Sequence, residues 1–407
     1  MLGQQLGAVA MVTAWTFCVF AAAADTVEPV LAPAPAVVKV LEGLGDNSSA
    51  LLTDLKTEGD WNAVTKEFGM ERTGPVGRDY TNKAVWMPDR QRAFFCGANH
   101  GAPHRLNDAW EFDLVSHTWV MLFAPDPHNA EGVMEIKEFD VDGQKLKYVQ
   151  TKRGGPTHFG HTWWAFCYDP GMKAALWMNV HIGGSPADYI EKETGSTKDV
   201  YSGPPMWSFL PWEKKWRMVF SPPPYPKVPY AAQMEYIPDL GGPILVTSVA
   251  GSGYEGYGSW LYQTKSNSWK QLQGETDEPI YESLTAYDRE NKILVAQEPG
   301  RATLHYDVKA NQWTKVLDPG KDSPDAPAGH DAYSQMYYDP VNKVCLLYHP
   351  ESPDSMWSYS VKDKQWTRNK VNGPACPKGR IINYFDEARN VFVINLGDTT
   401  WVYRYRS

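Results

Sequence analysis

Residues 260–269 read WLYQTKSNSW, and this short stretch decides the fold. Side chains alternate between the two faces of a β-strand, so Trp260 and Tyr262 lie on the same face. The interval of nine residues between Trp260 and Trp269 leaves room for a polar turn and a returning strand. The stretch therefore predicts a β-hairpin that carries its aromatic side chains on one face.

The same pattern recurs along the chain: counted from its first residue, an aromatic residue follows at two positions and a Trp at nine positions. Complete copies begin at Trp110, Trp207, Trp260, Leu304 and Trp357, and a sixth copy begins at Trp401. Two apolar segments joined by an aspartate-containing turn precede each copy. The turn aspartates are Asp89, Asp169, Asp239, Asp288, Asp339 and Asp386. We expect these carboxylates to cap backbone amides in the turns, which is a structural role. The repeating unit is thus four antiparallel strands.

A four-stranded sheet with aromatic residues on both faces cannot bury them alone, so such units pack against one another and close radially. The sequence predicts an all-β fold over residues 56–407, a six-bladed β-propeller of four-stranded antiparallel blades. The sixth copy stops soon after Tyr403, before its second Trp. We expect an N-terminal strand in the segment GDWNAVTKEF (59–68), which contains Trp61, to supply the missing outer strand and close the ring.

The order of strands within the unit resembles a known repeat. An apolar strand, a second apolar strand ending near Gly, a W-x-aromatic strand and a Trp-bearing strand are similar to the kelch repeat and the galactose-oxidase-like propeller superfamily. The double glycine of that repeat is mostly absent here, and Cys96-Gly97 and Ala250-Gly251 each keep one glycine. The resemblance implies the fold and leaves the function open, because such propellers include enzymes and many binding proteins.

The N-terminus indicates export. Residues 6–24 are apolar and end in small residues, which predicts a signal peptide over 1–24, with a membrane anchor as the alternative. The Pro/Ala-rich and polar stretch 25–55 predicts a linker. We expect a secreted or periplasmic protein without stable membrane insertion after cleavage. Disulfides and free thiols both remain open for the later cysteines.

The charge balance argues against one class of partner. Lys and Arg total 39 against 48 Asp and Glu, which gives a formal net charge of −9. A nucleic-acid partner is therefore not expected.

The longer loops fall on one predicted face, formed by the connections between second and third strands and between blades. Eight of the ten histidines map there. The insertion 123–160 contains an Asp142-Gly143 turn between alternating segments, which predicts a hairpin over this ligand face. Loops of this kind on a rigid scaffold usually carry function, so we expect a His-rich central mouth that binds a ligand, with carbohydrate favoured.

Two functional hypotheses share this mouth, and whether the protein is an enzyme stays open. A lyase or epimerase acting on an acidic glycan needs a base and a cation that stabilises the developing charge. The candidate catalytic residues are His158, His161, Tyr281, Arg78 and Arg380. A non-catalytic propeller would bind a glycan or a protein partner at the same loops. The candidate ligand-binding residues are His100, His104, His181, Tyr230, Arg301, His330 and His349.

Metal chemistry is a weaker hypothesis. A copper-radical oxidase would need two His, a Tyr and a Tyr cross-linked to Cys, and Tyr348, His349 and Cys96 lack a convincing spacing for it. The pairs His158-x-x-His161 and His100-x-x-x-His104 are possible ligand pairs on loops. Metal content and cofactors are left undetermined by the sequence.

Overall fold

The computed structural model describes much of the chain. The described residues are 31–59, 74–75, 77–78, 81–97, 107–126, 132–157, 164–178, 185–227, 232–247, 258–272, 283–297, 302–318, 320, 323–324 and 335–407. The chain divides into two compact units, residues 1–30 and 31–407, and every described residue belongs to the second unit. Among the described residues, no helix has the length and hydropathy needed to cross a bilayer.

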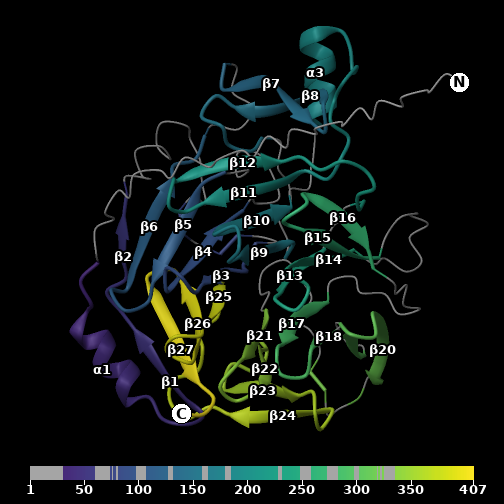
Figure 1. The fold of residues 1–407 in the computed structure, drawn as a ribbon. Helices are drawn as coiled ribbons and strands as arrows, with labels where there is room; N and C mark the ends of the chain where they lie inside the picture. The colour runs from purple at the N-terminus through teal and green to yellow at the C-terminus, as the bar shows by residue number, and fades with distance from the viewer. Residues whose placement is uncertain are drawn as a thin grey trace, which may run out of the picture. The chain divides into compact units, whose positions relative to one another are not determined.

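Among the described residues, six sheets form the blades of the second unit, each with four antiparallel strands, and a two-stranded hairpin forms a seventh sheet (Figure 1). Blade 1 contains β3 (Val85–Met87), β4 (Arg92–Cys96), β5 (Ala109–Asp113) and β6 (Thr118–Phe123), and blade 2 contains β9 (Phe166–Asp169), β10 (Ala174–Met178), β11 (Met206–Leu210) and β12 (Lys215–Val219). Blade 3 contains β13 (Gln233–Ile237), β14 (Gly242–Val246), β15 (Ser259–Gln263) and β16 (Ser268–Gln271), and blade 4 contains β17 (Leu284–Asp288), β18 (Ile293–Gln297), β19 (Thr303–Asp307) and β20 (Gln312–Leu317). Blade 5 contains β21 (Met336–Asp339), β22 (Val344–Tyr348), β23 (Ser355–Ser360) and β24 (Gln365–Lys370), and blade 6 contains β25 (Ile382–Asp386), β26 (Val391–Leu396), β27 (Thr399–Arg404) and β1 (Ser48–Leu52).

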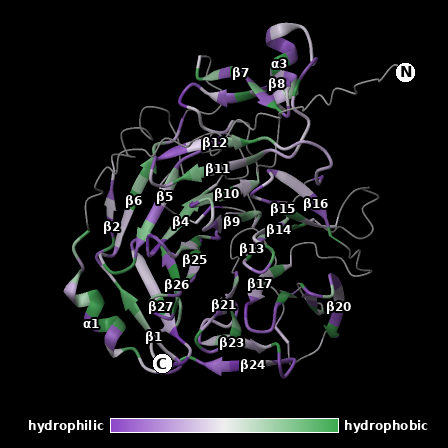
Figure 2. Cartoon of the chain, viewed as in Figure 1, coloured by the Kyte–Doolittle hydropathy of each residue, from purple (hydrophilic) through white to green (hydrophobic). Residues whose placement is uncertain are grey.

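The first strands of the blades contact one another in a closed cycle, which confirms the six-bladed propeller. The contacts run from β3 to β9, β13, β17, β21, β25 and back to β3. The inner strands of the blades are hydrophobic and pack between neighbouring blades, as in the fully buried β10. The outer strand β24, in contrast, is largely hydrophilic and exposed (Figure 2). Burial of apolar area between neighbouring sheets therefore holds the ring together.

The repeated aromatic residues pair across the outer hairpin of each blade. Tyr262 lies directly opposite Trp269, and their ring centroids are 5.1 Å apart. The equivalent pairs in the other complete copies have centroid distances of 4.9 to 5.2 Å. In blade 4 the outer Trp313 also donates its indole N–H to Ser259 Oγ of blade 3 at 2.8 Å. The pairs thus fix strand register, and the indole docks one blade on the preceding one.

The turn aspartates have the predicted structural role. Asp288 Oδ1 accepts hydrogen bonds from the backbone N–H groups of Glu290 and Asn291 at 2.9 and 3.0 Å. Some also join blades, since the hydroxyl of Tyr287 in blade 4 donates to Asp239 of blade 3 at 2.6 Å. Asp169, Asp339 and Asp386 also cap backbone amides, whereas Asp89 and Asp239 accept from a tyrosine hydroxyl of the next blade.

An N-terminal strand closes the ring, as predicted, but it is a different strand from the one expected. β1 pairs with β27 in antiparallel register, with Ser49 opposite Tyr403. Trp61 lies outside the described residues, and the edge of β27 that it was expected to cover is already occupied by β1. Pairing of β1 here removes an exposed sheet edge.

The predicted linker is folded over its described part, 31–55. Helix α1 (Pro35–Gly43) begins with Pro at its first turn and buries Val37 and Leu41 against the core. Arg404 donates from Nη1 to the carbonyls of Leu41 and Leu44 at 3.0 and 2.6 Å, which caps the helix C-terminus. The short strand β2 (Lys56–Glu58) then adds a parallel fifth strand to blade 1. These residues are therefore part of the propeller.

The long insertion forms a separate hairpin beside blade 2. β7 (Met134–Val141) and β8 (Gln144–Thr151) are antiparallel and joined by the Asp142-Gly143 turn, whose positive φ angles of 53° and 80° fit a two-residue hairpin loop. Phe139 of β7 packs on Phe220, with ring centroids 4.2 Å apart, and β8 contacts helix α3 (Pro186–Thr194). Its position over a ligand face stays a prediction.

Candidate functional site

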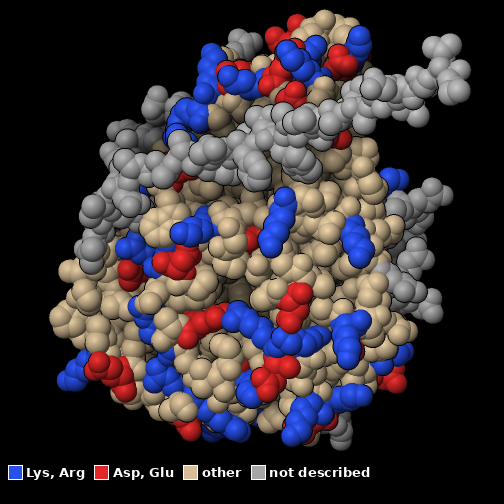
Figure 3. All heavy atoms as spheres, in the orientation of Figure 1, with Lys and Arg blue, Asp and Glu red and all other residues tan. Residues whose placement is uncertain are grey.

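A cavity of about 310 Å³ lies where the first strands of the six blades converge. Residues from the ends of these strands, and from the turns that follow them, form its wall. The cavity therefore lies at the end of the axis opposite to the longer loops, on which the sequence predicted a His-rich mouth. Figure 3 shows a hollow near the middle of the ring of first strands, with acidic and basic side chains beside it. Clefts of this kind, at the axis of a propeller, are where small ligands bind.

Aromatic side chains surround this cavity, one from the end of each first strand. They are Trp86, Tyr168, Tyr236, Tyr287, Tyr338 and Phe385. Burial and the hydrogen bond to Asp239 raise the pKa of Tyr287 well above its usual range, and burial and Asp89 do the same for the pKa of Tyr168. Both phenols are therefore neutral at physiological pH, and their hydroxyls are occupied by the neighbouring blade.

A largely buried ion pair joins blades 1 and 3 on the cavity wall. Lys83 of blade 1 donates from Nζ to Glu235 Oε1 of blade 3 at 2.9 Å, and also to the carbonyl of Met234 at 2.9 Å. The Lys83 side chain is 4% exposed and that of Glu235 is 20% exposed. Thr285 of blade 4 donates to the same Oε1 at 3.2 Å. Three blades thus contribute to one polar cluster on the cavity wall.

This pair keeps hydrogen-bonding capacity. An ammonium has three N–H donors, and Lys83 uses two of them on Met234 and Glu235. The second carboxylate oxygen of Glu235, Oε2, has no hydrogen-bond partner among the described residues. Both residues line the cavity, so a donor and an acceptor are available side by side to a bound molecule.

A second ion pair lies in the turns at the end of the cavity. Arg289 of blade 4 and Glu387 of blade 6 are joined by two hydrogen bonds, of which that from Nη1 to Oε2 measures 2.9 Å. Their side chains are 47% and 25% exposed. Both residues line the cavity, and the pair links two blades that are not neighbours in the ring.

The opposite ends of the first strands carry a layer of buried polar side chains. Gln233 donates from Nε2 to the carbonyl of Ser283 at 2.5 Å, and the indole of Trp164 donates to Asn82 Oδ1 at 3.2 Å. Asn383, also fully buried, accepts at its carbonyl and donates at its amide to blade 1. The axis of the propeller is therefore polar at this end and aromatic at the other.

Three of the predicted site residues lie within the described chain. Arg78 is buried, and its guanidinium binds Asp108 Oδ2 at 2.5 Å and the carbonyl of Gly74 at 2.9 Å. Gly77 packs so closely on the backbone of Arg380 that a Cβ there would lie 2.5 Å from the Arg380 carbonyl carbon. The two segments that carry Arg78 and Arg380 are thus adjacent, although the Arg78 guanidinium is turned toward Asp108.

His349 follows β22 and accepts a hydrogen bond at Nδ1 from the Glu351 amide at 3.3 Å. The other predicted site residues lie outside the described residues. They are His100, His104, His158, His161, His181, Tyr230, Tyr281, Arg301 and His330. Their roles stay predictions.

The four cysteines after residue 30 are all free and buried. Cys167 lines the central cavity, and burial raises the pKa of its thiol well above the usual range. Among the described residues, no three His, Cys, Asp or Glu side chains gather closely enough to hold a metal ion. The Cys167 thiol is therefore protonated at neutral pH and reacts slowly.

Sequence reasoning did not identify the charged residues of this cavity. A signal for its aromatic wall was present, because an aromatic residue precedes the turn in each blade, as in Tyr287-Asp288 and Phe385-Asp386. Lys83, Glu235 and Glu387 belong to no repeated pattern. Only the folded ring places them together.

Comparisons with known proteins find solved structures of low sequence identity. No family model and no curated protein matches the chain. An auxiliary nutrient binding protein from Bacteroides thetaiotaomicron VPI-5482 is 12% identical, with a TM-score of 0.47 over 88% of this chain and 77% of that one. A gluconolactonase from Xanthomonas campestris is 8% identical, with a TM-score of 0.45 over 81% of this chain and 87% of that one. Neither similarity carries a functional argument.

Proposed function

We propose that this protein is an exported, kelch-like propeller that binds a carbohydrate in its central cavity. The observation that carries the proposal is the Lys83–Glu235 pair, which keeps one N–H donor and one carboxylate oxygen without a hydrogen-bond partner among the described residues, inside an aromatic wall. A secreted or periplasmic location would bring such a protein into contact with free sugars.

The chemistry of a sugar matches this pair. Each sugar hydroxyl both donates and accepts a hydrogen bond, so one hydroxyl can accept from Lys83 while its neighbour donates to Glu235. Hydrogen bonds to charged groups are shorter and stronger than neutral ones, and a setting of low dielectric strengthens them further. The pair is therefore suited to a vicinal diol.

The wall and the volume agree with a small ligand. Small-molecule sites are lined mainly by apolar and aromatic side chains with a few placed polar groups, and they span about 300 to 1,000 Å³. This cavity, at about 310 Å³, is at the small end of that range. Aromatic rings such as Trp86 offer flat apolar area to the C–H face of a sugar ring. We expect a monosaccharide or disaccharide.

Calorimetric titration of the purified protein with a panel of neutral monosaccharides and disaccharides tests the proposal. Lys83→Met removes the donor, and we expect the affinity to fall roughly tenfold to a hundredfold, since a hydrogen bond to a charged group contributes about 1.5–3 kcal/mol. Trp86→Ala tests the aromatic wall in the same assay. Lys343→Met is the matched control, because Lys343 lies in an exposed turn and pairs with Glu290.

A second readout locates the ligand. A bound sugar should slow the reaction of Cys167 with a small thiol reagent, followed at alkaline pH because the buried thiol reacts only as its thiolate. The part of the reaction that the sugar slows should be missing from Cys167→Ser, which separates it from the reaction of the other buried cysteines. Binding that survives Lys83→Met and Trp86→Ala in folded protein, or no binding by any sugar of the panel, would contradict the proposal. Capture of a protein in place of a sugar would favour the interaction-module alternative.

A further inference from the structure

We infer that the cavity selects neutral sugars and discriminates against sugars that carry a carboxylate or a phosphate. This inference rests on the proposed function and specifies the ligand class of the same site. It differs from the expectation of an acidic glycan that the sequence raised.

The charges of the cavity are already neutralised within the protein. The charged residues among its described lining are Lys83, Glu235, Arg289 and Glu387, which form two ion pairs. The sum of these charges is zero. The lining described therefore contains no cation without a carboxylate partner.

Arg289 is the residue that would otherwise hold an anion. Its guanidinium is the planar fork that suits a carboxylate or phosphate, and Glu387 occupies that fork with two hydrogen bonds. Each of these residues comes from a different blade, so the rigid ring fixes the pair in place. An anionic sugar that approached the remaining N–H groups of Arg289 would lie beside the Glu387 carboxylate, which already neutralises the guanidinium and repels a second negative charge.

Binding of the anionic group elsewhere in the cavity, away from Arg289, is also unfavourable. A charge taken from water into a cavity without a partner loses its hydration, and the free oxygen of Glu235 adds repulsion at short range. Lys83 offers one N–H, but its charge is already balanced by Glu235 at 2.9 Å. A neutral hydroxyl meets none of these penalties.

The test compares a neutral hexose that binds with the uronic acid of the same ring stereochemistry at pH 7, by calorimetric titration of the whole protein. We expect the uronate to bind at least tenfold more weakly. Glu387→Gln releases the guanidinium of Arg289 from its counter-ion. We expect this variant to raise the affinity for the uronate, so that the ratio of the hexose affinity to the uronate affinity falls about tenfold. Glu290→Gln is the matched control, because Glu290 lies in an adjacent turn position and pairs with Lys343 outside the cavity lining.

The outcomes separate the two claims. Equal or tighter binding of the uronate by the unmodified protein overturns the inference and leaves the proposed function intact. A preference for the neutral sugar that Glu387→Gln does not change overturns the role given to the Arg289–Glu387 pair. Failure of every sugar, neutral or acidic, overturns the proposed function and the inference with it.

Discussion

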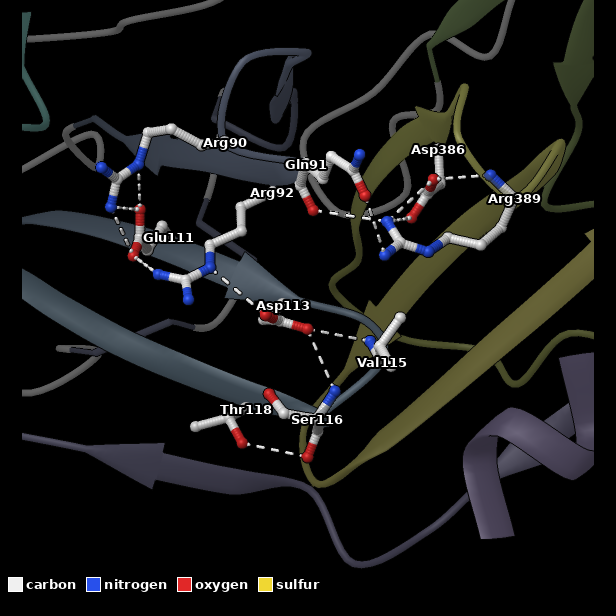
Figure 4. Close-up of polar contacts among 10 residues, drawn as sticks. All are labelled: Arg90, Gln91, Arg92, Glu111, Asp113, Val115, Ser116, Thr118, Asp386 and Arg389. Atoms are coloured by element: carbon white, nitrogen blue, oxygen red, sulfur yellow. Dashed lines mark hydrogen bonds and ion pairs between the residues drawn. The ribbon is translucent and has the colours of Figure 1, made fainter. Parts of the chain in front are cut away.

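Glu111 is the residue whose substitution gives the sharpest test of the fold. Its side chain is 1% exposed, and Figure 4 shows that it lies between two arginines of the preceding turn and strand. Arg90 binds it with Nε and Nη2 at 2.7 to 2.9 Å, and Arg92 binds its Oε1 through Nη1. We predict that Glu111→Gln strongly destabilises the protein while it preserves the shape of the side chain.

The magnitude of this effect depends on how deeply the two arginines that lose this counter-ion are buried. The Arg90 side chain is 2% exposed, so it would keep a buried charge without this counter-ion. Arg92 is 13% exposed and also contacts Asp113, at 3.2 Å, so it contributes less to the cost. Breaking a buried ion pair by removing one partner costs about 3–5 kcal/mol, and we expect the free energy of unfolding to fall by about that amount.

Urea unfolding followed by tryptophan fluorescence measures this free energy by linear extrapolation. Glu213→Gln is the control, because Glu213 pairs with Arg217 at the surface and such pairs contribute about 0–1 kcal/mol. In a double-mutant cycle, Arg90→Met should cost much less in the Glu111→Gln protein than in the unmodified one. A loss below about 1 kcal/mol for Glu111→Gln, equal to that of the control, would refute the reasoning.

Two further predictions concern a contact between blades and a buried carboxyl group. Trp313→Phe keeps the aromatic pair and removes the indole N–H that donates to Ser259. Because the buried hydroxyl loses its partner, the free energy of unfolding measured in urea should fall by about 1–3 kcal/mol. The double variant with Ser259→Ala should recover part of this loss, and additive losses would contradict the contact. Burial raises the pKa of Asp386 from 3.8 to about 6. Between these pH values the folded state keeps a proton that the unfolded state releases. The resulting contribution to the free energy of unfolding is complete below about pH 4 and is lost as the pH rises through about 6. Relative to Asp386→Asn, the unmodified protein should therefore lose about 3 kcal/mol between those values, at 1.36 kcal/mol per pH unit, and parallel pH profiles of the two proteins would contradict the shift.

Most of the fold could be predicted from sequence because its determinants are local. The interval between Tyr262 and Trp269 predicts a hairpin, and the turn at Asp288 indicates where a first strand ends. The structure places both as expected, with the aromatic rings paired and the carboxylate on backbone amides. The identity of the closing strand was harder, since the segment 48–52 carries no tryptophan and little apolar alternation.

The candidate site was mostly beyond sequence reasoning. Histidines on loops suggested a mouth, and the loops that carry most of them lie outside the described residues. Arg78, chosen as a cation for a ligand, is instead held by Asp108, whose charge and position give no sign of this contact in the sequence. A residue type alone therefore did not indicate whether a guanidinium was free to bind.

The sequence by itself determined the repeating unit, its turns, the six-fold ring and the need for an N-terminal strand, because hydrophobic alternation and turn chemistry act over a few residues. Only the tertiary structure decided which side chains meet on the axis. Lys83 and Glu235 are 152 positions apart in the chain, and Arg289 and Glu387 are 98 apart. Such pairs arise only when closure of the ring brings distant first strands to a common axis, so no local pattern in the chain records them.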